Sequence, residues 1–266
     1  MYKILLLLLL SFILVDLQAQ DRVFTYTYQS GVLNKGQKEI EVWSTLASGR
    51  TDYYKGLKHR LEFEIGLGHN VQTAFYLNSK YSSAVATENG VKSLVNSSSY
   101  SFANEWKIKL TDPMANSLGS ALYLEYVIAP TASALEGKLI LDKQMGLFTS
   151  AFNLVGEYEV ERDFVSQGAD LVSVKKDQVA IELNYGLSYS IKKNVNFGFE
   201  AMNKNQMLGT SYSRSILMAG PSLSYRGSGY WINLTCMPQI ANLKGGGLEL
   251  ADNEKMQTRL IFSYEF

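Results

Sequence analysis

The side chains that could do chemistry in this chain are acidic and basic residues that alternate with apolar ones. Glu62 and Glu64, for example, stand between Leu61, Phe63 and Ile65. Such groups can line a charged passage that favours some solutes, fill an interior as ion pairs, or act together as acid and base. The charged residues that alternate with apolar neighbours in this way include Glu39, Glu41, Arg60, Glu62, Glu64, Glu105, Lys107, Lys109, Glu125, Glu157, Glu159, Glu182, Glu200 and Arg259.

A catalytic role for these residues has little support in their spacing. A serine two residues from a histidine would place a nucleophile and a base on one side of a strand. Instead, Leu61 follows His59 at that distance and Val71 follows His69. Two isolated histidines and the single Cys236 do not make a zinc site. We therefore expect no enzyme, no metal and no cofactor, although an outer-membrane hydrolase stays as a minor alternative.

The elements that must position the charged residues are β-strands. Successive side chains of a strand point to opposite faces, so alternation gives each segment one apolar and one polar face. This pattern predicts strands at 38–48, 57–68, 71–81, 99–111, 118–129, 136–144, 148–161, 177–191, 195–204, 213–226, 230–241 and 255–266. Pro221 should mark a bulge or an unpaired backbone position within its strand.

The predicted connections alternate in length from the second strand onward. Short connections at 68–70, 111–117, 144–147, 192–194 and 226–229 are interleaved with a moderate one at 130–135 and long ones at 81–100, 162–177, 203–213 and 242–255. Short turns at one rim and longer loops at the other are typical of transmembrane barrels. The pattern therefore predicts an all-β, antiparallel up-and-down transmembrane barrel of about 12 strands, with roughly 10 to 14 compatible with uncertain strand ends. A soluble lipocalin-like barrel or sandwich is the less favoured alternative.

The first residues have the features of an exported protein. A lysine at position 3, an apolar run at 4–15 and Ala19 resemble a signal peptide, which we assign to residues 1–19, with cleavage after Ala19 or Gln20. Residues 20–37 are open to three interpretations: an additional strand, a segment in the periplasmic mouth, or a disordered lead-in. We favour a short periplasmic-side segment outside the main barrel, which would then comprise residues 38–266.

The composition agrees with this picture. Seventeen Tyr, 12 Phe and 21 Gly against four Pro suit strands and turns. A single cysteine excludes an intramolecular disulfide, so closure of the hydrogen-bonded sheet must hold the fold. Basic and acidic residues balance at 25 each, which argues against nucleic acid as a partner.

Several blocks resemble a known group of proteins. They are the segments at 24–28, 35–36, 39–43, 59–67 and 71–78, together with the C-terminal strand. In this order they are similar to a largely uncharacterised family of outer-membrane β-barrel proteins common in Bacteroidota. The resemblance implies an outer-membrane location and a barrel fold, with no known substrate. It also makes Phe262, Tyr264 and Phe266 resemble the signal that the barrel-assembly machinery recognises.

These observations lead to a functional expectation. A barrel of about twelve strands lies between sizes that side chains fill and sizes that form channels. We expect a porin-like or substrate-channel protein of the outer membrane that passes small polar solutes through a glutamate-rich, cation-leaning lumen. The alternative is a closed structural or surface-binding barrel that acts through its long extracellular loops. The expected partners are outer-membrane lipid, the assembly machinery and the solute itself.

Overall fold

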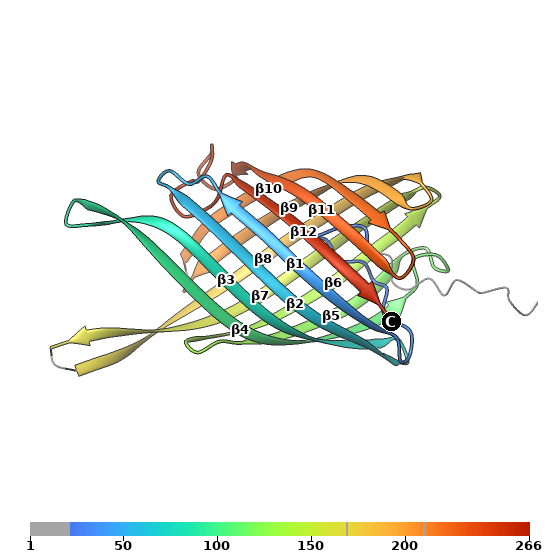
Figure 1. Ribbon diagram of the computed structural model, residues 1–266, viewed down its shortest axis with the longest axis horizontal. Helices are drawn as coiled ribbons and strands as arrows, with labels where there is room; N and C mark the ends of the chain where they lie inside the picture. Colours follow the sequence, from blue (N-terminus) through green and yellow to red (C-terminus); the bar gives the residue numbers. More distant parts are fainter. Residues whose placement is uncertain (1–21, 169, 210) are drawn as a thin grey trace, which may run out of the picture.

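The chain forms a closed barrel of antiparallel strands (Figure 1). The computed structural model describes residues 22–168, 170–209 and 211–266, so the predicted signal peptide lies outside the described residues. The strands neighbour one another in chain order, and β1 pairs with β12 to close the ring. This confirms the predicted all-β fold and its count of twelve strands. Among the residues described, no helix is long and apolar enough to cross a membrane.

The twelve strands differ widely in length. The bounds are β1 Lys38–Ser48, β2 Tyr54–Gly68, β3 Val71–Glu88, β4 Val91–Thr111, β5 Gly119–Ile128, β6 Ala132–Met145, β7 Phe148–Gln167, β8 Asp170–Lys192, β9 Val195–Leu208, β10 Ser211–Arg226, β11 Tyr230–Asn242 and β12 Met256–Glu265. Each predicted strand is present, and β3, β4, β7 and β8 run well past their predicted ends.

The two faces of the sheet have opposite character. Inward positions carry buried polar residues, whereas the outward positions of the same strands carry exposed apolar ones. In β2, for example, Glu62 is buried while Leu61 is 49% exposed. The outer face includes a cluster of aromatic rings near the C-terminus, in which Tyr230 contacts Phe262 and Tyr264 contacts Phe266. An apolar outer face with a polar interior is the arrangement of membrane-embedded barrels.

The structure corrects the prediction of long loops at one rim. Residues 81–100 and 162–177 are not loops but the ends of two hairpins, β3–β4 and β7–β8, which project far beyond the barrel (Figure 1). Asn89 and Gly90 close the first hairpin with positive φ angles of 50° and 78°, as tight hairpin turns require. Nearly all side chains near both tips are exposed on both faces. The hairpins therefore lack the one-sided apolar pattern from which strands are recognised.

Two other features of the sheet bear on the predictions. The pairing between β10 and β11 skips residues 219–221, so the backbone around Pro221 is unpaired toward β11, as its missing N–H requires. The β9–β10 connection is also tighter than predicted, because β9 and β10 extend to Leu208 and Ser211. The connection between β11 and β12 is a true long loop.

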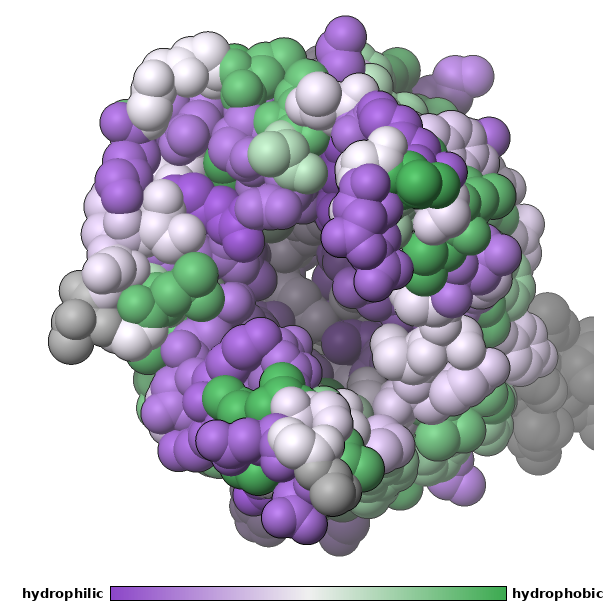
Figure 2. All heavy atoms as spheres, turned by 90° about the vertical axis from the view of Figure 1, so that its left-hand side faces the viewer, coloured by the Kyte–Doolittle hydropathy of each residue, from purple (hydrophilic) through white to green (hydrophobic). Residues whose placement is uncertain are grey.

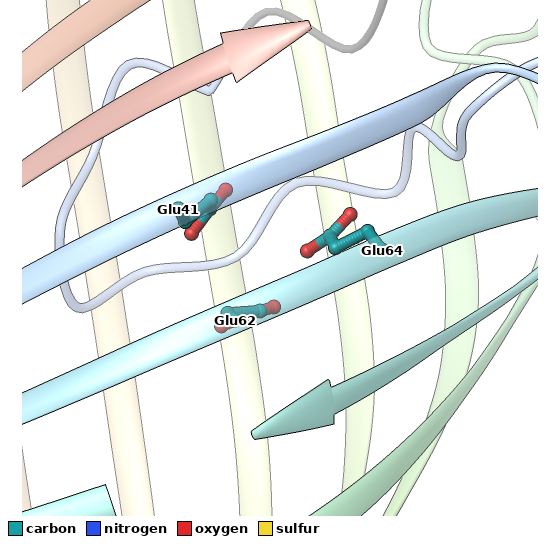
Figure 3. A group of neighbouring side chains, drawn as sticks. All are labelled: Glu41, Glu62 and Glu64. Atoms are coloured by element: carbon teal, nitrogen blue, oxygen red, sulfur yellow. The ribbon is translucent and has the colours of Figure 1, made fainter. Parts of the chain in front are cut away.

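The N-terminal segment lies inside the barrel, which corrects the expectation that it sits outside. Residues 22–34, here called the plug, contain nine buried residues, including Phe24, Thr25 and Thr27. Figure 3 shows this part of the chain passing through the interior beside β1 and β2. A turn then leads into β1, where Gly36 donates a hydrogen bond to the carbonyl of Gly66 in β2.

Candidate functional site in the barrel lumen

The plug is held by a glutamate of the barrel wall. Glu200 in β9 accepts hydrogen bonds from the backbone N–H groups of Thr25, Tyr26 and Thr27 at 2.7–2.8 Å. The Thr235 hydroxyl of β11 donates to the same carboxylate at 2.6 Å. The side chain of Glu200 is completely buried, and charge-assisted hydrogen bonds of this kind are roughly twice as strong as neutral ones. Glu200 is therefore an anchor for the plug rather than a group that faces an open passage.

Amide side chains from other strands satisfy more of the plug backbone. Asn153 in β7 accepts from the N–H of Tyr28 at 2.7 Å and donates to the carbonyl of the same residue at 2.9 Å. Gln72 in β3 accepts from the N–H of Leu33 at 2.9 Å, and Asn233 in β11 donates to the carbonyl of Arg22 at 2.8 Å. Because buried backbone groups need partners, these contacts from widely separated strands fix the path of the plug.

Glycines make room for the plug at two points. A Cβ atom at Gly66 in β2 would lie 2.1 Å from the carbonyl oxygen of Asn34, and one at Gly186 in β8 would lie 2.8 Å from the ring of Phe24. Neither glycine has the positive φ that would require glycine for the backbone alone. Their role is steric, since they let the segment approach the wall closely.

A row of glutamates crosses the inner face of the barrel. Direct cross-strand neighbours in this row are Glu265 with Glu39, Glu39 with Glu64, Glu105 with Glu125, Glu125 with Glu136, and Glu136 with Glu157. Only Ala74 separates Glu64 from Glu105. Like charges directly opposite one another destabilise a sheet. The row therefore requires compensating groups, and it was invisible in the sequence because its members lie on different strands.

Basic residues supply part of this compensation. The Arg60 guanidinium in β2 lies 3.5 Å from Glu125 and 3.9 Å from Glu62. Three further ion pairs place Lys138 at 2.9 Å from Glu136, Lys204 at 3.6 Å from Glu157 and Arg226 at 3.4 Å from Glu265. The plug adds Arg22, which lies 3.8 Å from Glu41.

Aromatic rings interleave with the cations at the level of the plug. The guanidinium of Arg22 lies over the rings of Tyr28 and Trp43 at 4.2 and 4.5 Å, and that of Arg60 lies over Tyr76 at 4.1 Å. Arg259 of β12 lies 3.8 Å from the ring centre of Tyr26. Cation–π contacts gain strength when water is excluded. This layer of rings and cations, together with the plug, occupies the middle of the barrel.

A large polar cavity lies on the side of the long hairpins. Its volume is about 790 Å³, and Tyr26 and Tyr28 of the plug contribute to its lining. We call this cavity the vestibule. Figure 2 looks onto the end of the barrel from which the hairpins project and shows a hollow surrounded mainly by hydrophilic residues. A second cavity of about 200 Å³ is lined by Arg22, Val23 and Gln29 of the plug, together with strand residues such as Trp231.

Acidic residues of the vestibule are concentrated on one wall and basic residues on another, although Lys138 and Lys204 pair with Glu136 and Glu157 on the acidic wall. The acidic wall carries Glu136 in β6, Glu157 and Glu159 in β7 and Glu182 in β8. The basic wall, about six strands away around the ring, carries Arg259 in β12, Lys58 and Arg60 in β2 and Lys80 in β3. In all, eight acidic and seven basic side chains line the cavity. The acidic excess expected from the sequence is therefore nearly balanced here.

The structure divides the sequence-predicted lumen residues into three groups. Those buried beside the plug are Glu39, Glu41, Glu62, Glu64, Glu105, Lys107 and Glu200, whereas those lining the vestibule are Arg60, Glu125, Glu157, Glu159, Glu182 and Arg259. Lys109 lies near the short-turn rim, where it pairs with Asp112 at 3.2 Å. The predicted assembly residues Phe262, Tyr264 and Phe266 are exposed on β12 and its C-terminal end.

Several residues of the site were missed by the sequence analysis. Arg22, Gln72 and Asn153 carry no recognisable motif, and only the long-range fold gives them their roles. The fold also brings Ser44 within 2.9 Å of the Nδ1 atom of His59, across β1 and β2. His59 is exposed and Ser44 is half-buried, and both side chains point outward. The spacing of residues along one strand could not reveal this serine–histidine pair, because its members lie on two strands. Among the hydrogen bonds described, no Asp or Glu bonds to His59, as the third residue of a catalytic triad would.

Comparisons with known proteins agree on the fold. A family model described as "Family of unknown function (DUF6662)" matches residues 16–266, and no curated protein matches the chain. The COG4313 outer membrane channel from Pseudomonas putida F1 is similar in structure, with a TM-score of 0.62, 10% identity, and coverage of 92% of this chain and 100% of that one.

Two other solved structures show how widely this fold is used. The KdgM porin in complex with disordered oligogalacturonate has a TM-score of 0.51 and 14% identity, covering 86% of this chain and 99% of that one. The translocator domain of the autotransporter NalP from Neisseria meningitidis has a TM-score of 0.54 and 12% identity, covering 88% and 89%. At these identities the similarity establishes the barrel fold alone, because channels and translocators share it.

Proposed function

The chain belongs to DUF6662, a family of unknown function, and we propose that it is a porin-like outer-membrane barrel for small polar solutes, with the plug setting the constriction. The observation that carries this proposal is the vestibule, a polar cavity of about 790 Å³ lined by eight acidic and seven basic side chains. Rings of charged side chains are a common basis of selectivity in pores. Because the two signs nearly balance, solutes with both a positive and a negative group fit better than simple cations.

The plug determines whether such a solute can cross. It lies between the vestibule and the smaller cavity, and residues of the plug line both. Passage through the whole barrel therefore requires the plug to shift within the lumen or to leave it. Glu200 is the point at which this movement can be tested, because its carboxylate accepts three plug N–H groups.

The decisive experiment is to measure the conductance of the refolded mature protein in planar bilayers, alongside the Glu200→Ala variant. We expect a small current from the parent protein and a current at least tenfold larger from the variant, since the plug loses hydrogen bonds worth roughly 1.5–3 kcal/mol each. Glu159→Ala is the matched control, because Glu159 lines the vestibule and no described hydrogen bond joins it to the plug.

The outcome separates this proposal from its alternative. If both proteins insert fully and neither passes current or takes up neutral and zwitterionic solutes in liposome-swelling assays, the pore proposal is wrong. The closed barrel that acts through its surface would then be favoured, and the projecting β3–β4 and β7–β8 hairpins would be the first surfaces to examine. The length of these hairpins is the observation that supports this second candidate.

The outer-membrane location is supported by the apolar outer face. Leu61 lies on that face and Glu62 on the inner face of the same strand. We expect Leu61→Arg to impair insertion by about 2–4 kcal/mol if the position lies near the bilayer midplane, as measured by refolding into lipid vesicles. Glu62→Gln should insert normally, and equal tolerance of the two changes would contradict the membrane placement.

A further inference from the structure

Three buried carboxylates from two neighbouring strands converge beside the plug. Glu41 in β1 and Glu62 in β2 are direct cross-strand partners, and Glu64 follows two positions along β2. One carboxylate oxygen of each lies within 4.8 Å of those of the other two. Figure 3 shows the three side chains close together on the neighbouring strands β1 and β2. All three residues are at most 4% exposed.

The partners of these carboxylates are unevenly distributed. Glu41 accepts from the indole N–H of Trp43 at 2.5 Å, and Glu64 accepts from the amide of Gln72 at 2.7 Å. By contrast, the Oε2 atom of Glu62 is buried without a hydrogen-bond partner, and its ion pair with Arg60 is long, at 3.9 Å. Leaving a buried charged oxygen unmatched is costly, which points to a ligand at this position.

A fourth carboxylate gives an independent indication. Glu105 lies across the small side chain of Ala74 from Glu64, and its Oε2 atom is also buried without a hydrogen-bond partner. Carboxylate oxygens of Glu62 and Glu64 lie within 4.8 Å of each other. Two buried carboxylates this close repel each other unless a proton or a cation compensates their charge.

The local charge requires compensation, by a cation or by protons. Five carboxylates meet in this region: Glu39, Glu41, Glu62, Glu64 and Glu105. The basic groups beside them are Arg22 and Lys107, together with Arg60, whose closer partner is Glu125. If all five carboxylates are ionised, the three basic groups leave an excess of about two negative charges, or three when Arg60 is counted with Glu125. A divalent cation would neutralise most or all of this excess.

We propose that Glu41, Glu62 and Glu64 bind a calcium ion, with Glu105 as a further or water-mediated ligand. Calcium takes six to eight oxygens at about 2.3–2.6 Å, so the oxygens around one ion lie up to about 5 Å apart, as observed here. Three carboxylates can supply most of these ligands. Magnesium fits less well, since it keeps several waters and demands a strict octahedron. This proposal does not depend on the proposed transport function.

Terbium luminescence tests the site directly. Tb³⁺ replaces calcium at oxygen sites, and the indole of Trp43 is hydrogen-bonded to Glu41, close enough to sensitise its emission. We expect the refolded full-length mature protein, stripped with a chelator, to give sensitised emission on adding Tb³⁺ and to lose it when calcium is added in excess. Calcium should also raise the thermal unfolding temperature of the chelator-treated protein.

Matched variants make the result specific. Glu62→Gln keeps the shape of the side chain and relieves repulsion, so the barrel should fold while Tb³⁺ affinity falls at least tenfold. Glu159→Gln, the same change on the vestibule wall, should leave affinity unchanged. If the parent protein shows no saturable emission and no calcium effect on unfolding, the proposal is overturned. An infrared band of protonated carboxyl that persists with calcium and disappears in Glu62→Gln would also overturn it, by showing that protons balance the cluster.

Discussion

The plug layer and the vestibule use the same residue types in opposite ways. Beside the plug, Glu41 and Glu200 are withdrawn from solvent and engaged by Arg22, Trp43 and the plug backbone. In the vestibule, Glu159 is only partly buried and no described ion pair engages it. Desolvated charges need partners to be tolerated, whereas hydrated ones do not. A glutamate on an inner strand face can therefore be a structural anchor or a solute-facing group, depending on what fills the lumen at its level.

This comparison explains why barrel size did not settle whether the lumen is open. One level of the barrel is filled, not by wall side chains alone but by the plug, and another level is hollow. The two sequence-based alternatives, a charged pore and a salt-bridged interior, thus both describe parts of the same molecule. Substitutions beside the plug and substitutions in the vestibule should therefore differ strongly in their effects on stability and on conductance.

The largest effect is expected for Arg22→Ala. The guanidinium of Arg22 pairs with Glu41, stacks on Tyr28 and Trp43, and bonds two plug carbonyls. Removing one partner of a buried ion pair costs about 3–5 kcal/mol, so the plug should detach and chymotrypsin should cut the chain near its aromatic residues. Lys80→Ala on the vestibule wall is the control, and equal protease resistance of the two variants would contradict the distinction between levels.

A smaller effect is expected for Gly66→Ala. The added methyl group would collide with the carbonyl oxygen of Asn34, and overpacking of this kind costs about 1–3 kcal/mol. Urea titration of the refolded barrel should show the loss, together with faster cleavage of the plug. Gly156→Ala on β7 meets nothing within 4 Å and should leave both measurements unchanged. If Gly66→Ala changes neither the urea stability nor the rate of plug cleavage, the plug does not pack against β2.

The smallest effect on stability is expected for Glu159→Gln. Because the carboxylate faces the vestibule and is hydrated, the free energy of unfolding should change by less than about 0.5 kcal/mol. The reversal potential of a conducting variant should nevertheless move toward anion preference, since one charge leaves the acidic wall. A large loss of stability without any change in selectivity would show that Glu159 has a structural role like that of the glutamates beside the plug.

Particular elements show how far the sequence was informative. The alternation in β2 and the aromatic end of β12 predicted the strands and their two faces, because a half-buried strand must alternate. The β3–β4 and β7–β8 hairpins were mistaken for loops, because strands exposed on both faces carry no such signal. The glutamates were recognised as inward residues, but nothing in their spacing distinguished Glu200, which anchors the plug, from Glu159, which faces the vestibule.

The sequence by itself determined the barrel, its number of strands and which face of each strand is polar, since these follow from local periodicity. Only the tertiary structure decided where the N-terminal segment lies, which glutamates meet across strands and which cations compensate them. Strand register and chain path bring Arg22, Glu41 and Glu200 together from positions far apart in the chain. Such contacts depend on closure of the whole sheet, and no short stretch of residues encodes them.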